Sequence, residues 1–345
     1  MTSKSFAARV GIAAITLTAL GLAAATPAAA HTNNMFTLIE FDEQTEQTGF
    51  ATYSKTDGST AFLGTTFPAE RLYVAGIEVF DERGVLLGAG GEESPFVQPW
   101  DHKTGAVSEA MSVYVAAIDS ELFEIVGLDT LNNGTTITVA GYEARESEEG
   151  PYEDYVDILS VNVGTGELVP LVQLRDALAV EDELQYEPTG IATDPLTGIT
   201  YVFLQDAESS EPYFIAVDVA AGTVGSPTLF QGTYFGAGEV RGADFDADGS
   251  LYFNFDNYPE DELQLLKFAK QSDWATGEPL YISTAPAEQG LRFIYEQALT
   301  IEHTALAATG SELPIVAWLL VGTVAVLAGG VTVMVARRRS ETGTV

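Results

Sequence analysis

The sequence predicts an all-β protein: a β-propeller, most simply of five four-stranded blades with a split closing blade, followed by one C-terminal transmembrane helix. Short apolar runs closed by Gly, Asn or Asp turns recur along the middle of the chain, and helical periodicity is almost absent. A repeat of roughly 50 residues with four strands is typical of propeller blades. Six or seven blades remain the alternative, because residues 143–157 have room for a degenerate blade.

The chain begins with a segment typical of a secretory signal peptide, residues 1–30. Basic residues come first, an apolar stretch follows from Val10 to Ala25, and small residues precede His31. We therefore expect a mature outer domain that covers residues 31–305 and lies outside the cell.

Four complete units follow, and the first strand of each carries a glycine. These glycines are 51, 63 and 52 residues apart, at Gly76, Gly127, Gly190 and Gly242. A turn rich in Asp, Asn and Gly comes after each first strand, and three further strands complete the unit. The unequal intervals indicate insertions in the loops. The best helix candidate, residues 174–184, is a connector between units.

The fifth unit is divided between the two ends of the outer domain. Residues 298–302 align with a first strand, whereas residues 36–41, 49–53 and 61–65 supply three strands that lack one. Pairing these segments would complete a blade and remove two exposed sheet edges, which otherwise invite association. We therefore expect a closed ring and a monomer.

The alignment of the units also places glutamates at one shared position, three residues before the glycine. They are Glu124, Glu187, Glu239 and, in the split unit, Glu296, while Tyr73 stands there in the first unit. First strands line the channel of a propeller, so we expect a ring of carboxylates at one end of it. Such a ring must be protonated, hydrogen-bonded or neutralised by a cation, and Ca²⁺ prefers oxygen ligands of this kind. Backbone hydrogen bonds around an empty ring are the simpler alternative.

A second cation candidate is the series Asp244, Asp246 and Asp248, which ends in Gly249. This spacing resembles the start of a calcium loop. The acidic residue that such a loop needs at its twelfth position is replaced by Phe255, and Asp and Gly are also favoured in hairpin turns for their geometry alone. Metal binding by these aspartates is the weaker of the two interpretations.

Composition narrows the class of function. The chain has 50 Asp and Glu against 15 Lys and Arg, a net charge of −35, so nucleic acid is not an expected partner. It has no cysteine and only three histidines, His31, His102 and His303, which are widely separated. No nucleophile elbow, zinc motif or phosphate loop is present, and we predict no catalytic residue.

The C-terminal end contains an uncharged apolar run of 24 residues, 313–336, which is long enough to span a membrane. Arg337, Arg338 and Arg339 follow in the tail 337–345 and would stay in the cytoplasm. Ahead of the run stand Leu306, Ala307, Ala308, Thr309 and Gly310. These five residues resemble the L-A-x-T-G sorting signal of class E sortases in high-GC Gram-positive bacteria. The resemblance implies cleavage after Thr309 by a sortase and transfer to cell-wall peptidoglycan; a plain membrane anchor is the alternative.

The repeats are also similar to those of several extracellular bacterial propeller families. That similarity indicates an architecture. Because a tethered propeller without a visible catalytic set is most simply a display surface, the sequence favours a wall-anchored binding or adhesion module of unknown ligand. An extracellular carbohydrate-active or lactone-cleaving hydrolase that uses the channel carboxylates, with or without a divalent cation, is the second hypothesis. A structural wall protein is the third.

Overall fold

The computed structural model describes residues 35–42, 47–68, 73–80, 83–89, 95–116, 119–145, 153–180, 183–230, 235–259, 262–269, 279–284 and 299–302. All of them lie in one compact unit of the chain. The predicted signal peptide, the sorting motif, the apolar run 313–336 and the basic tail lie outside the described residues. Within the described ranges, no helix is long and apolar enough to cross a membrane.

The described strands form five blades, which confirms the predicted all-β propeller and its blade number. Blade I consists of β24 (Leu299–Ile301), β1 (Met35–Asp42), β2 (Gln47–Tyr53) and β3 (Thr60–Pro68). Blade II consists of β4 (Tyr73–Phe80), β5 (Arg83–Ala89), β6 (Phe96–Trp100) and β7 (Met111–Ser112). Blade III consists of β9 (Asp119–Thr130), β10 (Thr136–Arg145), β11 (Glu153–Val161) and β12 (Glu167–Gln173), with β8 (Tyr114–Val115) added at its outer edge.

Blade IV consists of β15 (Tyr186–Thr193), β16 (Thr200–Asp206), β17 (Pro212–Asp218), β18 (Thr223–Val224) and β19 (Thr228–Leu229). Blade V consists of β20 (Gly238–Phe245), β21 (Leu251–Asn257), β22 (Glu262–Phe268) and β23 (Leu280–Thr284). A short connector between blades III and IV holds α2 (Arg175–Leu178), β13 (Ala179–Val180) and β14 (Glu183–Leu184).

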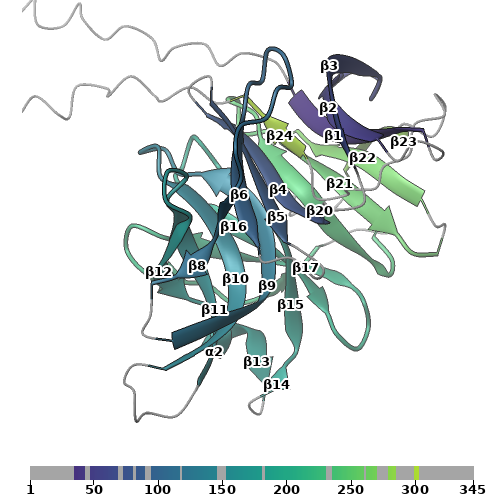
Figure 1. Ribbon diagram of the computed structural model, residues 1–345. Coiled ribbons are helices and arrows are strands. Elements are labelled where there is room, and N and C mark those ends of the chain that lie inside the picture. Colours follow the sequence, from purple (N-terminus) through teal and green to yellow (C-terminus); the bar gives the residue numbers. More distant parts are fainter. Residues whose placement is uncertain are drawn as a thin grey trace, which may run out of the picture. The chain divides into compact units, whose positions relative to one another are not determined.

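The first strands of the blades contact one another in a closed ring, in the order β24, β4, β9, β15, β20 and back to β24 (Figure 1). The predicted split blade is therefore present. β24 pairs antiparallel with β1, in the register Met35 with Ile301 and Thr37 with Leu299. Chain segments from the two ends of the domain thus share one sheet, in the order β24-β1-β2-β3.

The repeated glycines lie where neighbouring first strands approach closely. A Cβ atom on Gly76 would lie 2.5 Å from the backbone nitrogen of Leu128, and one on Gly190 would lie 2.6 Å from the carbonyl oxygen of Arg241. In β4, β9, β15 and β20 a register shift falls at or beside the glycine. The glycine repeat therefore reflects the contact between blades rather than a turn, since only a residue without Cβ fits there.

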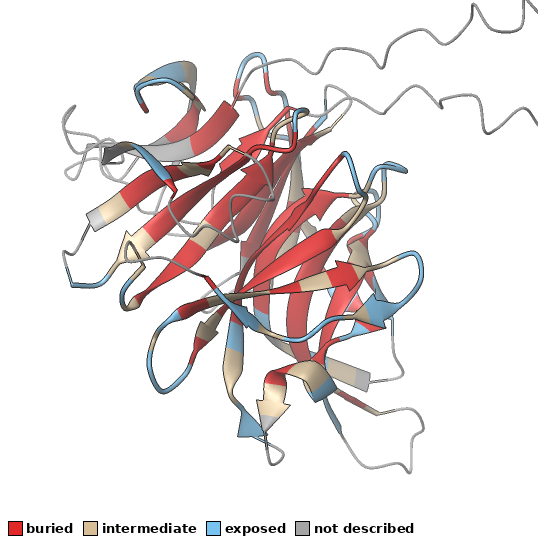
Figure 2. Ribbon diagram, turned by 180° about the vertical axis from the view of Figure 1, so that it is seen from behind, coloured by how far each residue is buried: buried red, intermediate tan, exposed pale blue. Residues whose placement is uncertain are grey.

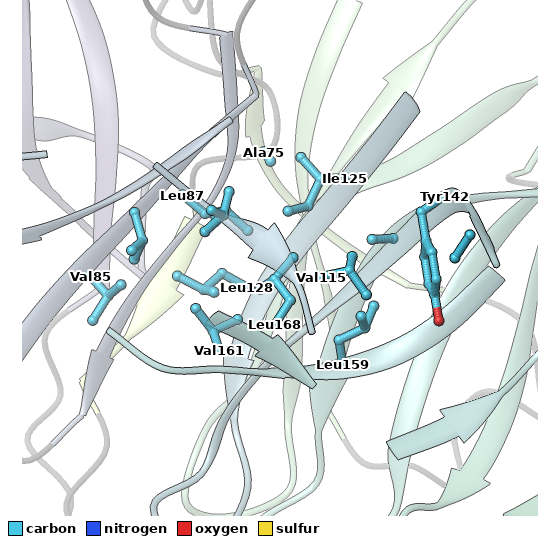
Figure 3. Close-up of a cluster of buried hydrophobic side chains, with 14 residues drawn as sticks. Ala75, Val85, Leu87, Val115, Ile125, Leu128, Tyr142, Leu159, Val161 and Leu168 are labelled. Atoms are coloured by element: carbon cyan, nitrogen blue, oxygen red, sulfur yellow. The ribbon is translucent and has the colours of Figure 1, made fainter. Parts of the chain in front are cut away.

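Apolar side chains between adjacent blades form the core. Figure 2 shows that burial is concentrated along the strands, while exposed residues lie mostly in turns and loops. Between blades II and III, Ala75 and Leu87 pack against Ile125, Leu128 and neighbouring side chains of blade III (Figure 3). Between blades IV and V the filling is aromatic, with Phe203, Phe230, Phe253 and Phe268 among its members. Close packing of this kind fixes the first strands in position around the channel.

Two predictions about the connectors need correction. Residues 175–178 form only one helical turn, Arg175–Leu178, and the backbone becomes extended at Ala179, where the two-stranded hairpin β13–β14 begins. The described residues of the segment 143–157, which are 143–145 and 153–157, form no additional blade. Glu143 pairs with Asp154 and Tyr142 with Tyr155, so this segment includes the ends of two paired strands of blade III.

Candidate functional site

Three of the four aligned glutamates converge at one end of the channel. Glu187 and Glu239 lie at the start of β15 and β20, whereas Glu124 lies midway along the longer strand β9; the three strands are neighbours in the ring. Burial, and after it the charges of Glu187 and Glu239, raise the pKa of Glu124. Such mutual influence requires the carboxyl groups to be close to one another. Glu296 lies outside the described residues, and Tyr73 is the first residue of β4. We call this region the acidic mouth: Glu124, Glu187, Glu239, Arg241 and Asp256.

The three glutamates have different surroundings. Glu124 and Glu187 are exposed to water, and within the described ranges neither makes a hydrogen bond or an ion pair. Glu239 is buried, with 7 % of its surface exposed. The side chain of Glu124 is exposed, but protein surrounds much of it. The resulting loss of solvent is the main cause of its raised pKa. The mouth therefore presents two accessible carboxyl groups above a buried one.

The buried glutamate has a cation of its own, which the sequence analysis missed. Arg241 forms an ion pair with Glu239, and its Nη2 atom also lies 3.3 Å from Oδ2 of Asp256 on β21. Burial raises the pKa of Glu239, while Arg241 opposes this shift. Arg241 stands directly before Gly242 and two residues after Glu239 in a strongly acidic chain. Residues two apart in a strand lie on the same face of the sheet, so this spacing could have indicated the pair.

Two further polar side chains hold Glu239 in place. The hydroxyl of Tyr258 donates a hydrogen bond to Oε1 of Glu239 at 2.6 Å, and Nε2 of Gln205 donates to the hydroxyl of Tyr258 at 2.9 Å. Gln205 belongs to β16, so this chain of hydrogen bonds links blade IV to blade V. The same contact, with burial as the larger cause, raises the pKa of Tyr258 to about 12. The hydroxyl of Tyr258 therefore keeps its proton at neutral pH, donates a hydrogen bond to Glu239 and positions it.

The structure separates the three aspartates of the calcium-like series. Oδ2 of Asp244 accepts a hydrogen bond from the backbone N–H of Ile301 at 2.6 Å, in the interior of the domain. Asp246 pairs with Nζ of Lys55 at 2.8 Å, and Asp248 accepts a hydrogen bond from the backbone N–H of Ser250 at 2.9 Å. Each carboxylate thus has a different partner. Among the described residues, no three His, Asp or Glu side chains are grouped so that they could hold a metal ion.

The other side of β24 is held by blade II. The hydroxyl oxygen of Thr300 accepts a hydrogen bond from the backbone N–H of Val79 at 3.2 Å and lies 3.0 Å from Oε2 of Glu78. His102, one of the scattered histidines, is buried with its Nε2 atom 3.7 Å from Oε1 of Glu302. His102 therefore belongs to the packing around the ring-closing strand, not to the acidic mouth.

Comparison with known proteins finds similarity to solved structures at low identity. No family model and no curated protein matches the chain. Among solved structures, a periplasmic gluconolactonase of Pseudomonas aeruginosa is 10 % identical with a TM-score of 0.40, covering 72 % of this chain and 81 % of its own. A gluconolactonase of Xanthomonas campestris is 14 % identical with a TM-score of 0.40, covering 74 % and 78 %. A protein of unknown function from Dyadobacter fermentans is 9 % identical with a TM-score of 0.44, covering 74 % and 85 %. Similarities this low carry no argument about activity.

Proposed function

We propose that this protein is a surface-displayed binding module whose acidic mouth binds a ligand with an organic cation, such as a primary ammonium group. The observation that carries the proposal is the contrast between the glutamates. Glu239 already has Arg241 as its counterion, whereas Glu124 and Glu187 are exposed and without an ion-pair partner in the described part of the chain.

The electrostatics of the mouth favour a cation. Four carboxyl groups and one guanidinium meet there, so the mouth is strongly negative when its acids are ionised. Burial raises the pKa of Glu124, repulsion by Glu187 and Glu239 raises it further, and a bound cation would relieve that repulsion. An ammonium group can be shared by two carboxylates, whereas Ca²⁺ takes six to eight oxygen ligands. The organic cation is therefore the ligand class that we propose.

We further propose that the chain is secreted, processed by a class E sortase and joined through Thr309 to cell-wall peptidoglycan. The direction of the first strands is compatible with such display. Glu187 and Glu239 lie at the starts of β15 and β20, and Glu124 is close enough to feel their charges. Thr300, in contrast, lies beside Glu78, five residues beyond Tyr73 in β4. The chain therefore leaves β24 at the end away from the acidic mouth.

Calorimetric titration of the purified protein tests the binding proposal. Methylammonium, putrescine and lysine amide serve as cationic probes, and acetamide serves as the neutral control. We expect putrescine or lysine amide to bind and the double variant Glu124→Gln/Glu187→Gln to lose that binding. Absence of binding by every cation, or equal binding by the double variant, would reject the proposal.

Cell fractionation tests the display proposal separately. We expect Thr309→Ala to move the protein from the wall fraction to the membrane fraction, because the sortase then has no threonine to cleave after. Wall attachment that persists in this variant would rule out the sorting signal.

Hydrolysis by the channel carboxylates is the second candidate function. The observation that favours it is the raised pKa of Glu124 beside other carboxyl groups, since a protonated acid next to a carboxylate is the pattern of general acid catalysis. Chromogenic glycosides and an aldonolactone, assayed with and without Ca²⁺, test it. Turnover that disappears in Glu124→Gln would favour the hydrolase over the binding module.

A further inference from the structure

A hollow of about 570 Å³ lies between blade I and blade V, away from the acidic mouth. The turn between β2 and β3 forms one wall, and Asp246 and Tyr252 of blade V form the other. Asp246 follows the end of β20, whereas Glu239 lies at its start, so the hollow and the acidic mouth are at opposite ends of that strand. Its volume is ordinary for a small-molecule site.

The lining of this hollow is rich in hydroxyl groups. Seven of its residues carry hydroxyl groups, and they are Thr52, Tyr53, Ser54, Thr56, Ser59, Thr60 and Tyr252. Lys55 and Asp246 face each other across the seam of the two blades, 2.8 Å apart from Nζ to Oδ2, with 13 % and 15 % of their side chains exposed. The wall therefore offers both hydrogen-bond donors and acceptors, while its two charges cancel.

Tyr252 is fixed in position by two lysines. Nζ of Lys267 donates a hydrogen bond to its hydroxyl at 2.8 Å and lies 4.7 Å from the centroid of its ring. Nζ of Lys55 lies 5.5 Å from the same centroid. The two lysine contacts hold the ring of Tyr252 in place, so this wall of the hollow is formed before any ligand binds.

We propose that this hollow is a second binding site and that it takes a neutral saccharide. An apolar ligand would cover the hydroxyl groups without pairing them, which costs free energy. An anion would approach Asp246, and a cation would approach Lys55. A sugar offers many hydroxyl groups that both donate and accept, which matches the lining, and its neutrality leaves the Lys55–Asp246 pair undisturbed.

Saturation-transfer NMR on the purified full-length protein tests this site. The neutral probes are the methyl glycosides of glucose, galactose and N-acetylglucosamine, and the charged probes are glucuronate and glucosamine. We expect at least one neutral glycoside to bind in the millimolar range, more tightly than either charged sugar.

Two variants from the same wall locate the binding. Thr56→Val removes an exposed hydroxyl that makes no hydrogen bond in the described part of the chain, so the fold should tolerate it. Lys55→Met removes the cation. Each should weaken saccharide binding about fivefold to tenfold, the usual effect of one lost hydrogen bond. The matched control is Thr223→Val, an exposed threonine on β18, which should bind the sugar as wild type does.

Saturation-transfer NMR with the sugars and calorimetry with the cations together separate this site from the acidic mouth. The double variant Glu124→Gln/Glu187→Gln should keep its saccharide binding, and Thr56→Val should keep its binding of cations. Failure of all three neutral glycosides to bind, tighter binding of a charged sugar, or saccharide binding that Thr56→Val and Lys55→Met leave unchanged would overturn the proposal.

Discussion

The carboxylate of Asp244 accepts a hydrogen bond from the backbone N–H of Ile301 at 2.6 Å, which joins blade V to the strand that closes the ring. The hydroxyl of Thr300 lies 3.2 Å from the same carboxylate oxygen and 3.0 Å from Oε2 of Glu78 in blade II, and its one proton can serve either acid. β24 has only three residues, Leu299–Ile301. Buried side-chain contacts on both flanks therefore contribute much of what holds this strand in the ring.

We predict that Asp244→Ala lowers the free energy of unfolding by about 3 kcal/mol, because a buried N–H loses a charged acceptor. Urea unfolding followed by circular dichroism measures the change. Asp248→Ala is the matched control, since Asp248 accepts a local hydrogen bond from Ser250 in the turn. Equal losses in the two variants would contradict the special role of Asp244.

A second prediction concerns the contact between first strands. Gly190→Ala should destabilise the fold by roughly 2 kcal/mol, because the new methyl group would meet the carbonyl oxygen of Arg241. Gly236→Ala should be nearly neutral, since a Cβ at that position meets no atom within 4 Å. Thermal melts of both variants provide the comparison, and an equally stable Gly190→Ala would show that the blades can separate at no cost.

These glycines explain why the fold could be predicted from sequence. Contact between first strands leaves no room for a side chain at Gly76, Gly127 and Gly190. The packing therefore requires a glycine in each unit, and the glycines recur along the sequence. The split blade could be predicted for a related reason, because 298–302 and 36–41 each show a strand pattern that lacks its usual neighbours. The connector at 174–184 was less predictable, since a single helical turn has too few residues to show a period.

A third prediction is a pH dependence of stability that originates at Glu124. Its pKa in the folded state is raised above the usual value of 4.5, so the folded protein binds more protons than the unfolded chain as pH rises past that value. The contribution of Glu124 to the free energy of unfolding is therefore fully present at low pH and is lost as pH rises through the raised pKa. Glu124→Gln should therefore melt at a higher temperature than wild type at pH 7.

At pH 4 the difference should shrink, because wild-type Glu124 is then largely protonated and resembles glutamine. Melting temperatures at pH 4, 5, 6 and 7 measure this, with Glu109→Gln as the exposed control. A stabilisation of Glu124→Gln that is the same at every pH would refute the electrostatic explanation.

A fourth prediction concerns a buried pair in blade III. The hydroxyl of Tyr142 donates a hydrogen bond to Oδ2 of Asp157 at 2.6 Å, and burial raises the pKa of that aspartate while the hydrogen bond opposes the rise. Tyr142→Phe should cost about 2 kcal/mol at pH 7, because Asp157 loses its donor. The cost should be smaller at pH 4, where more of Asp157 is protonated.

Urea unfolding of Tyr142→Phe at the two pH values measures this cost. Tyr155→Phe is the control, because it keeps the stacking of the two rings, whose centroids are 5.1 Å apart. A cost that does not change with pH would show that the hydrogen bond to the carboxylate is not its source.

The candidate site was only partly predictable. Aligned positions on equivalent strands identified Glu124, Glu187 and Glu239, because a propeller brings equivalent residues to the same end of the channel. The partners of Glu239 could not be found this way. Arg241 has no counterpart in the other units, Tyr258 comes from the turn after β21 in blade V, and Gln205 comes from β16 in blade IV. The spacing of the Asp244 series was likewise uninformative, since Asp244 lies within β20 and faces the interior, whereas Asp246 and Asp248 belong to the turn.

The central claim is that the acidic mouth binds an organic cation through Glu124 and Glu187, and calorimetric titration of putrescine and lysine amide tests it most directly. Binding by wild type, weaker binding at higher salt, and its loss in Glu124→Gln/Glu187→Gln are the results that we predict. Binding that survives in the double variant, or no binding of either cation by the wild-type protein, would contradict the claim.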